Sequence, residues 1–503
     1  MTASREADWQ RLNVRMLAVT PLRQFAGFLP VIAIVLVIGV RQDLGDRVYG
    51  LVAAALAVVL AGVLRWLTTR YRITSERVEL RSGLLFRSAR SVPRDRIRSV
   101  DLTAGPVHQL FGLSVVQIGT GERSDGAESR ELTLDAVSAA DADRMRQRLL
   151  QSAYLEGTSV STPPAATELA ALNWSWLRFA PLTASSMVAV GAVAGAIGQL
   201  IGDVGTDVVD VGGVGERLSM APLWLGVAAF ALLVLVIAVV GSVLLFVEAW
   251  WGFRLIREAG GALRIRRGLF TTRSVSLEER RLRGIEVVEP VLLRLGRGAR
   301  TVAVATGLGE HRGQGRGTLL PPAPRDEAHR VSGAVLFEDP SPTRTALRRH
   351  PLVALRRRLV RAAVPVLAAS GALWLVPVPA WVAWATLGLL PLTVLLALDA
   401  YRNLGHAVTN RYLVARHGAG VRDTVALQRC GVIGWTVSQS LFQRRAGLVT
   451  VTATTAAGSG GYRVIDVATA EGLAVAEQVV PGLLEPFLQR DMSDAAHTLS
   501  SGT

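Results

Sequence analysis

Arginine is the side chain through which this sequence offers most chemistry. All 55 basic residues are arginine and none is lysine, against 40 acidic residues. Without lysine, the chain lacks the phosphate-binding residue of a P-loop, the strand lysine of a protein kinase and the Schiff-base lysine of a pyridoxal-phosphate enzyme. The formal charge of +15 leaves acidic partners as the chemistry to consider.

The arginines gather beside apolar segments. Residues 65–98 hold ten arginines and three acids, and residues 344–361 hold seven arginines and no acid. Basic residues at a cytoplasmic membrane face gain about 1 kcal/mol each from anionic lipid. Two interpretations follow, a general attraction to lipid and a specific site for an acidic ligand. The candidate contacts with anionic lipid headgroups are Arg65, Arg70, Arg72, Arg356, Arg357, Arg358 and Arg361.

Other reactive residue types are sparse. The seven histidines show no metal-ligand spacing such as His-Glu-x-x-His, so His108 and His406 are predicted to be solvated or structural. Cys430, the one cysteine, excludes an intrachain disulfide and cysteine-based zinc or iron–sulfur sites. The glycine run at 307–317 does not open a helix after a strand, so we interpret it as a loop. We therefore expect no cofactor, no metal and no enzymatic activity.

Six apolar stretches predict helices that cross a membrane. Half of the residues are hydrophobic and only 19% are charged. A membrane-spanning helix needs about 20 apolar residues, with a range of about 17–25. The stretches occur in pairs with short connectors, which predicts three helical hairpins. They cover residues 25–40, 48–64, 179–201, 223–247, 359–376 and 380–398.

Charge bias predicts the orientation of these hairpins. Arginines precede the first stretch, follow the second and precede the fifth, whereas the connector 202–222 carries four acids and one arginine. Positive charge favours the cytoplasmic side. We expect both termini and all large domains in the cytoplasm of a bacterium, with six spans in its plasma membrane. The predicted helices contain almost no ionisable residue, which favours anchors over a transport pathway.

The stretch after each hairpin recurs three times. Residues 83–100 align without a gap with 268–285 and with 418–435. In the first copy, Val78 and Leu80 alternate with charged neighbours before Gly83, which is the period of a half-buried strand that leads into a hairpin turn. Each copy ends in helix-like sequence, at 138–150, 324–336 and 469–484, and Ser138 with Asp141 predicts an N-cap.

These residues carry a family resemblance. Tyr-Arg-Ile-Thr-Ser-Glu-Arg-Val at 71–78, Ser-Gly-Leu at 82–84, Pro-Arg-Asp-Arg-Ile at 93–97 and Leu-Phe-Gly-Leu at 110–113 resemble the bacterial pleckstrin-homology-like (PH-like) domain family of YdbS- and YdbT-type multi-pass membrane proteins. The second copy departs from the pattern, with Phe253 and Ile256 at the tyrosine and threonine positions, and the third keeps Thr409. The resemblance implies architecture more firmly than activity.

The predicted fold is that of a membrane protein with six transmembrane α-helices in three hairpins. By the resemblance, each hairpin is followed by a PH-like antiparallel β-sandwich with a C-terminal helix. The expected parts are a first hairpin (1–68), domain 1 (69–155), a linker and second hairpin (156–250), domain 2 (251–338), an arginine-rich linker and third hairpin (339–400), domain 3 (401–490) and a flexible tail (491–503).

The sequence thus predicts a membrane-anchored binding scaffold. Its partners would be the lipid bilayer, anionic lipid headgroups and a protein or peptide, including a second membrane protein, and a sandwich edge would suit addition of an extended peptide strand. Three linked weak sites would raise avidity. Nucleic acid is not expected, because the arginines adjoin the apolar segments and aromatic stacking residues are few. The alternative is a transport, export or peptide-protection component whose helices form a pathway.

Overall fold

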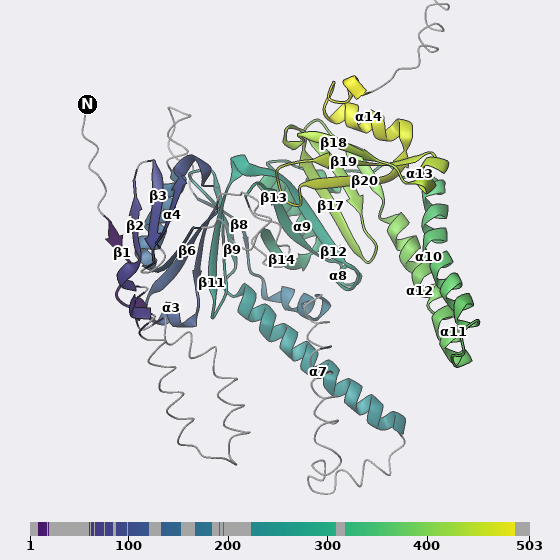
Figure 1. The fold of residues 1–503 in the computed structure, drawn as a ribbon, viewed down its shortest axis with the longest axis horizontal. Helices are drawn as coiled ribbons and strands as arrows, with labels where there is room; N and C mark the ends of the chain where they lie inside the picture. The colour runs from purple at the N-terminus through teal and green to yellow at the C-terminus, as the bar shows by residue number, and fades with distance from the viewer. Residues whose placement is uncertain are drawn as a thin grey trace, which may run out of the picture. The chain divides into compact units, whose positions relative to one another are not determined.

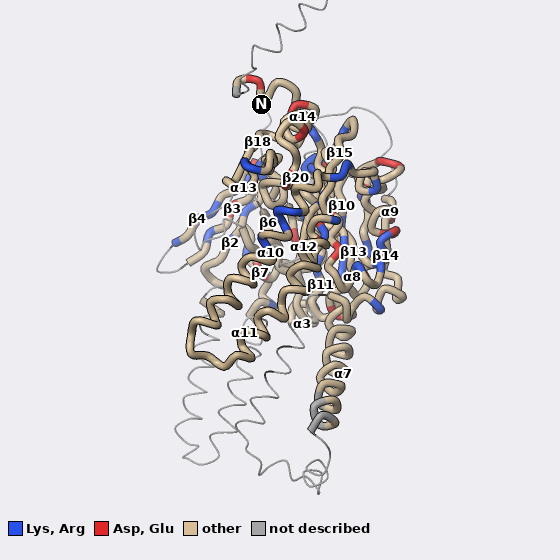
Figure 2. Tube along the Cα trace, turned by 90° about the vertical axis from the view of Figure 1, so that its right-hand side faces the viewer, with Lys and Arg blue, Asp and Glu red and all other residues tan. Residues whose placement is uncertain are grey.

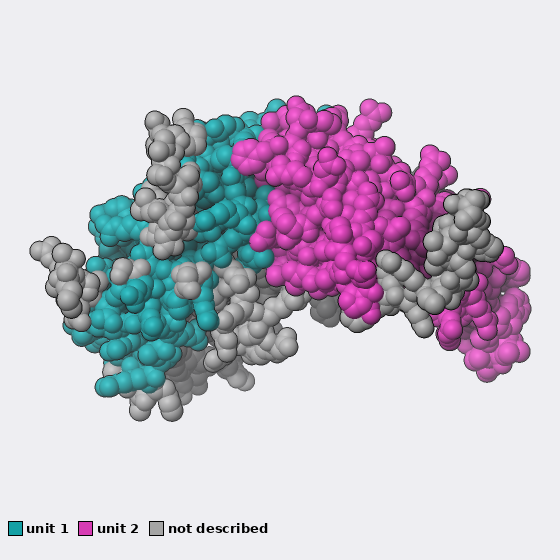
Figure 3. All heavy atoms as spheres, turned by 90° about the horizontal axis from the view of Figure 1, so that it is seen from above, with its two compact units in different colours: residues 1–282, 306–321 teal, residues 283–305, 322–503 magenta. Residues whose placement is uncertain are grey.

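The structure is a computed structural model that describes most of the chain in two compact units. Unit 1 comprises residues 1–282 and 306–321, and unit 2 comprises residues 283–305 and 322–503 (Figure 3). Each unit is described by itself. The described part runs from 9 to 487, without residues 18, 20–59, 61, 65, 75, 84–86, 98, 120–131, 152–165, 184–190, 192–194, 196–222 and 308–316.

Unit 1 begins with a four-stranded antiparallel sheet in the order β1-β2-β3-β4. The 3-10 turn η2 (Arg94–Arg96) leads from this sheet into β5. The strands are β1 (Gln10–Arg11), β2 (Arg70–Ile73), β3 (Arg77–Ser82) and β4 (Ser88–Pro93).

The second sheet of unit 1 has seven strands in the order β7-β6-β5-β11-β10-β9-β8 (Figure 1). Strands β5 and β11 pair antiparallel, so two successive strand groups of the sequence form one continuous sheet. Its strands are β5 (Ser99–Ala104), β6 (Leu113–Gly119), β7 (Leu132–Ser138), β8 (Thr167–Ala171), β9 (Arg254–Glu258), β10 (Ala262–Arg267) and β11 (Thr272–Glu278).

The core of the first sandwich lies between these two sheets. Val78 and Val92 pack with Ile118 and Leu134, and Met145 of α4 (Ala139–Gln151) closes the cluster. The alternation predicted for β3 is confirmed in that Val78 is fully buried and its neighbours are not. The predicted N-cap is confirmed as well, because the Asp141 N–H donates to Ser138 Oγ at 3.2 Å.

Unit 1 also holds the long apolar helix α7 (Leu223–Trp250), which projects away from the sheet (Figure 1). Charged residues are missing from most of its described length (Figure 2). The 3-10 helix η3 (Trp174–Leu182) packs against α7, and the short helix α3 (Pro106–Leu110) separates β5 from β6.

Unit 2 contains a six-stranded sheet in the order β14-β13-β12-β17-β16-β15, in which β14 crosses the unit boundary. Again two successive strand groups meet edge to edge, through the antiparallel pair β12 and β17. The strands are β12 (Leu282–Pro290), β13 (Gly298–Ala305), β14 (Thr318–Pro324), β15 (Gly405–Val408), β16 (Tyr412–His417) and β17 (Val421–Gln428).

A three-stranded sheet completes the last sandwich. It consists of β18 (Gly434–Ser438), β19 (Leu448–Thr454) and β20 (Gly461–Ala468). Its buried side chains pack with those of β16 and β17 and with α14 (Thr469–Val479). Helix α14 ends before the predicted residue 484 because Val480 precedes a proline, which favours extended backbone.

The remaining helical elements of unit 2 include an apolar hairpin formed by α10, α11 and α12. They are α8 (Val291–Leu295), α9 (Arg325–Leu336), η5 (Pro342–Arg344), α10 (Leu352–Leu373), α11 (Ala380–Leu387), α12 (Leu390–Arg402), η6 (Arg429–Gly431), α13 (Leu441–Arg445) and η7 (Glu485–Phe487). The 3-10 turn η4 (Glu279–Arg281) belongs to unit 1.

The sixth predicted apolar segment is not one helix. It divides into α11 and α12 at Gly388 and Leu389. The proline at position 391 explains the break, because its ring would clash with the carbonyl of Leu387 in a continuous helix. Together, α11 and α12 form one apolar span, Ala380–Arg402, that is long enough to cross a membrane.

Two helices of the described residues are long and apolar enough to cross a membrane, Ala231–Trp250 and Ala380–Arg402. The predicted segment 25–40 lies outside the described residues, as do most of 48–64 and of 179–201. The fifth segment lies in α10, where Arg361 shortens the apolar run to 362–373. The count of six spans therefore stays a prediction.

The turn glycines adopt the backbone that the hairpins require. Gly83, Gly268 and Gly418 follow β3, β10 and β16 with φ of 104°, 107° and 124°. A Cβ on Gly268 would lie 2.1 Å from the carbonyl oxygen of Thr271, so no other residue fits there without distortion. The hairpin turn predicted at Gly83 is confirmed.

Candidate functional site

The seven predicted lipid-contact arginines divide between the two units. Arg65 lies outside the described residues. Arg70 is exposed at the start of β2, and Arg72 donates to Glu79 Oε2 at 2.8 Å. The four others occupy the first turns of α10 in unit 2. Helix α10 therefore carries the densest part of the predicted site.

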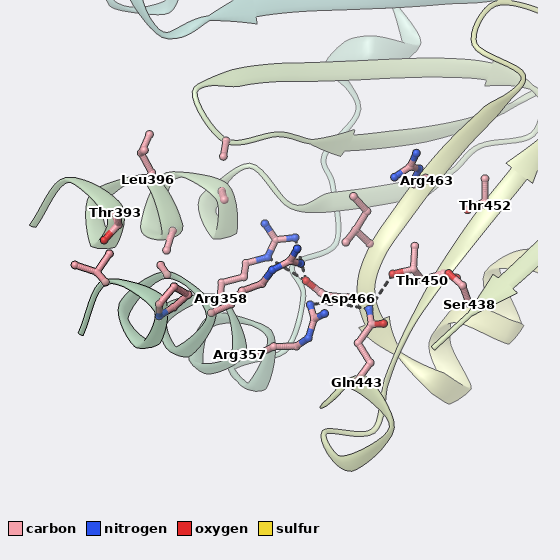
Figure 4. Close-up of a pocket in the computed structure, with 18 of the residues that line it drawn as sticks. Arg357, Arg358, Thr393, Leu396, Ser438, Gln443, Thr450, Thr452, Arg463 and Asp466 are labelled. Atoms are coloured by element: carbon pink, nitrogen blue, oxygen red, sulfur yellow. Dashed lines mark hydrogen bonds and ion pairs between the residues drawn. The ribbon is translucent and has the colours of Figure 1, made fainter. Parts of the chain in front are cut away.

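Asp466 holds two of the four arginines of α10. Arg357 Nη1 lies 2.6 Å from Asp466 Oδ1, and Arg358 Nε donates to Asp466 Oδ2 at 3.0 Å (Figure 4). The Gln443 amide of α13 donates to the same carboxylate at 2.9 Å. Asp466 is fully buried, so these donors replace the water that the carboxylate loses. The network fixes the start of α10 against the last sheet.

A β-bulge positions Asp466. The register of β19 and β20 shifts between Val449 and Val451, and Asp466 has a φ of 59°. Few residues other than glycine adopt this backbone, and aspartate is among the more tolerant. Ala136 in β7 takes the same φ of 59° beside an equivalent bulge. The bulge thus recurs in the fold, whereas the carboxylate belongs to the last sheet.

Arg356 and Arg361 of α10, with Arg445 of α13, form no ion pair among the described residues of unit 2. They line a cavity of about 780 Å³ whose remaining wall is mainly apolar. The spacing of α10 brings these groups together, because positions three and four apart share a helix face. The apolar lining consists of Val353, Val360, Val364, Pro365, Phe442 and Ala446. We call this site the arginine-edged groove.

A second cavity of about 980 Å³ lies between the helices α10 and α12 and the outer face of β18–β20. Ser438, Thr450 and Thr452 present hydroxyl groups from the sheet, and Arg463 borders them (Figure 4). Thr436 also lines this cavity. Hydroxyl and guanidinium groups are hydrogen-bond donors for oxyanions. Arg361 lines both cavities, so they adjoin at α10.

The comparisons with known proteins can be set beside this geometry. The family described as bacterial PH domain matches residues 20–153 and 362–478. The two matched segments resemble bacterial PH domains. A relative in Bacillus subtilis (strain 168), "UPF0699 transmembrane protein YdbT", is 24% identical over 425 residues, which cover 80% of this chain and 84% of that protein. No solved structure matches.

The family resemblance stated from the sequence is therefore confirmed. The two apolar helices among the described residues and the transmembrane relative indicate a membrane-associated protein. The family threonine has a visible role, because Thr74 Oγ1 accepts from the Arg77 N–H at 3.0 Å and Thr409 Oγ1 accepts from the Tyr412 N–H at 3.1 Å. Each closes the turn between two strands.

Sequence reasoning did not single out four polar residues of the site, namely Asp466, Gln443, Arg445 and Arg463. Asp466 left one signal in the sequence, an acid between the apolar residues Ile465 and Val467. A buried acid requires partners, and those partners lie about a hundred residues earlier in α10. No local pattern marks the other three.

His406 illustrates the same point. It was predicted to be solvated or structural, and it is buried with its Nδ1 3.1 Å from His350 Nε2. Burial, followed by the charge of Arg348, lowers the pKa of His406 to about 4. Burial, followed by the neighbouring His406, lowers the pKa of His350 as well. The His406 ring is therefore neutral at pH 7, and the contact between the two rings joins β15 to the segment before α10.

The metal and loop predictions concern limited parts of the chain. Within the described residues, no group of three or more His, Cys, Asp or Glu side chains could hold a metal ion. The glycine run begins at the turn residue Gly307, after β13 has ended, and β14 begins at Thr318. Residues 308–316 lie outside the described residues, so the loop stays a prediction.

Proposed function

We propose that this chain is a membrane-anchored, non-enzymatic scaffold that binds anionic lipid headgroups at the cytoplasmic face of a bacterial plasma membrane. The observation that carries the proposal is the arginine-edged groove. Three guanidinium groups, those of Arg356, Arg361 and Arg445, border an apolar surface at the start of an apolar helix hairpin and have no carboxylate partner among the described residues of unit 2. This combination matches an anionic amphiphile, with its phosphate on the arginines and its chains on the apolar wall.

The ion pairs with Asp466 assign distinct roles to the α10 arginines. Arg357 and Arg358 hold the helix in place, and Arg356 and Arg361 bind the ligand. Each arginine near an anionic surface contributes about 1 kcal/mol, so three contribute about 3 kcal/mol, which corresponds to roughly a hundredfold in affinity. The hydroxyl-lined cavity beside Arg361 adds donors for a larger headgroup.

The wider scaffold follows from the anchoring. Six spans with both termini in the cytoplasm would hold three PH-like domains at one membrane surface, and the arginine bias of the sequence supports that orientation. Reporter fusions at Gly212 and after residue 488 test it. A reporter active outside the cell at the second site contradicts the topology.

Native mass spectrometry of the full-length protein in detergent tests the lipid site. The probe is phosphatidylglycerol, with phosphatidylcholine as the neutral comparison. The triple variant Arg356→Gln, Arg361→Gln, Arg445→Gln is expected to lose affinity for phosphatidylglycerol by roughly a hundredfold. The matched control Arg77→Gln, Arg254→Gln, Arg300→Gln removes the same charge from exposed positions and should change the affinity by less than about threefold.

Three outcomes overturn the proposal. Equal losses in the two triple variants would show that net charge alone attracts the lipid. Equal binding of the two lipids by the unaltered protein would show that the site does not recognise the anionic headgroup. Movement of a solute across sealed vesicles by the purified protein would replace the scaffold with the transport alternative.

A further inference from the structure

The strand groups of this chain are joined by one repeated kind of joint. In unit 1, β5 pairs antiparallel with β11, with Ser99 opposite Leu277 and Leu102 opposite Ser274. In unit 2, β12 pairs antiparallel with β17, with Gly284 opposite Leu427 and Val287 opposite Thr424.

The two joints have the same register. In the gap-free alignment of the three sequence copies, position 99 corresponds to 284 and position 277 corresponds to 427. The pair Ser99–Leu277 is therefore equivalent to the pair Gly284–Leu427, and Leu102–Ser274 to Val287–Thr424. A one-residue slip would turn every side chain to the opposite face, so a shared register indicates a shared and specific way of joining.

At each joint, the earlier copy contributes β5 or its equivalent β12, and the later copy contributes β11 or its equivalent β17. The chain has three copies and two joints, so one strand of each type is left at its ends. These are β4, which corresponds to β11 and β17, and β18, which corresponds to β5 and β12. Among the described residues, β4 is the last strand in the order β1-β2-β3-β4, and β18 is the first in β18-β19-β20.

Burial distinguishes the joined strands from the two end strands. At the joints, Leu102 and Val287 are at most 8% exposed, whereas the corresponding Val437 of β18 is 44% exposed. Ser274 and Thr424 are buried, and the corresponding Ala89 of β4 is exposed. Val437 and Ala89 of the end strands are therefore exposed at positions that their counterparts bury, whereas Val92 of β4 is buried like its counterpart Leu277.

Strand β18 lacks the features that protect exposed sheet edges. Its five residues, Gly434–Ser438, include no charge and no proline. A Cβ on Gly284 would lie 2.2 Å from the carbonyl oxygen of Ala426 across the joint, whereas the nearest atom to a Cβ on Gly434 is 4.0 Å away, in Thr454. The place that the opposite strand fills at Gly284 is thus open at Gly434. Ser99 at the first joint shows that a small side chain is also accepted.

We propose that copies of this protein associate head to tail, with β18 of one copy pairing antiparallel with β4 of the next. The internal joints specify the register, which places Gly434 opposite Val92, Thr436 opposite Arg90 and Val437 opposite Ala89. The occupant of the β18 edge is a second copy because the complementary edge is carried by this chain itself. Such a contact joins two different surfaces, so it repeats and produces open chains or closed rings rather than isolated dimers.

Cysteine cross-linking of the full-length protein in membranes tests the register. Two differently tagged versions are co-expressed in a Cys430→Ser background, one with Val437→Cys and the other with Ala89→Cys. The expected result is a disulfide between the two tags, because directly opposed antiparallel residues have the Cα separation that a disulfide needs. The matched control replaces Ala89→Cys with Arg300→Cys, an exposed position outside the proposed contact, and should give roughly tenfold less cross-linking.

A second measurement covers the size of the assembly. Val437→Lys places a charge at the centre of the proposed contact, and Ile433→Lys places the same charge just outside β18, where the side chain is 65% exposed. Light scattering in detergent should show the mass fall to that of one chain for Val437→Lys only. Equal cross-linking in both tag pairs, cross-linking of Val437→Cys to another protein alone, or a single-chain mass before substitution would each overturn the proposal.

Discussion

The attachment of α7 in unit 1 and that of the α10–α12 hairpin in unit 2 are built differently. At the end of α7, Trp250 packs edge-to-face on Phe253 at 5.6 Å between ring centroids, and the Arg267 guanidinium lies 4.1 Å from the Trp250 ring centroid. Trp251 meets Trp174 at 5.3 Å in the same manner. At the start of α10, the buried Asp466 carboxylate binds two arginines instead.

Both attachments also contact a tight strand turn. The Gly268 N–H of the β10–β11 turn donates to the Trp251 carbonyl at 2.9 Å, and Asn403 Nδ2 donates to the Gly418 carbonyl of the β16–β17 turn at 3.1 Å. Each helix end thus rests on a tight strand turn. The side chains around it differ, because aromatic rings position a helix end at a membrane interface, whereas a buried acid orients arginines.

This difference explains why the candidate ligand site is found beside α10. At α7, the aromatic rings pack against one another, and the Arg267 guanidinium lies over the Trp250 ring. An acid that holds Arg357 and Arg358 fixes the face of α10 that carries Arg356 and Arg361. The ionic attachment therefore presents a groove, and its stability should depend on charge in a way that the aromatic attachment does not.

The largest expected effect is that of Asp466→Ala. The substitution leaves Arg357 and Arg358, each 17% exposed, without their carboxylate, and removal of one member of a buried ionic network costs about 3–5 kcal/mol. Ala136 already occupies the same backbone conformation in β7, so the loss would report the carboxylate rather than the backbone. Urea unfolding of the detergent-solubilised protein measures it. Asp466→Asn keeps hydrogen-bond acceptors and should lose less, and equal stability of all three proteins would contradict the ionic account.

Acidification should weaken unit 2 by a smaller amount. Burial, followed by the charge of Arg325, lowers the pKa of His329 to about 4. The unfolded chain has a histidine pKa of about 6.5 and binds a proton first as the pH falls, so this contribution is complete above about pH 6.5 and is lost between there and about pH 4. For His329 alone, the free energy of unfolding should fall by about 2 kcal/mol between pH 7.5 and pH 5.

The control for this pH dependence is His329→Gln, which removes the titrating ring. Unfolding midpoints measured at the two pH values should then differ less than in the unaltered protein. Identical pH dependence of the two proteins would assign the effect to other groups. Arg267 beside α7 supplies the contrast, because burial, the largest cause, lowers its pKa only to about 10, so that it keeps its charge throughout this range.

The smallest expected effect is that of Arg267→Gln at the aromatic attachment. A cation above a tryptophan ring contributes about 0.5–2 kcal/mol, according to how far it is desolvated. We expect a loss of about 1 kcal/mol in the free energy of unfolding, followed by tryptophan fluorescence during urea titration. Arg267→Lys keeps the charge and should recover part of the loss. A loss above that of Asp466→Ala would reverse the proposed order of the two attachments.

Much of the local structure was predictable from short-range patterns. Alternation placed Val78 in the core, the turn glycine at Gly83 was read correctly, and the helix beginning at Ala139 was predicted from its N-cap. Each of these depends on neighbours within a few residues. The division of Ala380–Arg402 at Gly388 was not predicted. The continuous apolar run indicated one helix, whereas the proline at position 391 interrupts the backbone.

The candidate site was predictable only in part. Arginine density located Arg356 and Arg361, but density alone could not separate them from Arg357 and Arg358. That distinction depends on Asp466, which is about a hundred residues away in sequence and within hydrogen-bond distance in space. Arg445 lines the groove from α13, and no apolar periodicity in the sequence predicted this helix.

The sequence by itself determined the local structure and composition of this protein, namely apolar helices, alternating strands, turn glycines and an excess of arginine. These follow from periods of two and of about 3.6 residues and from side-chain transfer into lipid, all of which act locally. The tertiary structure alone decided which arginines are held by Asp466, which border the groove and which strand edges meet. Those outcomes depend on pairings between distant segments, and pairing energies are set by distance and burial, which a linear pattern does not contain.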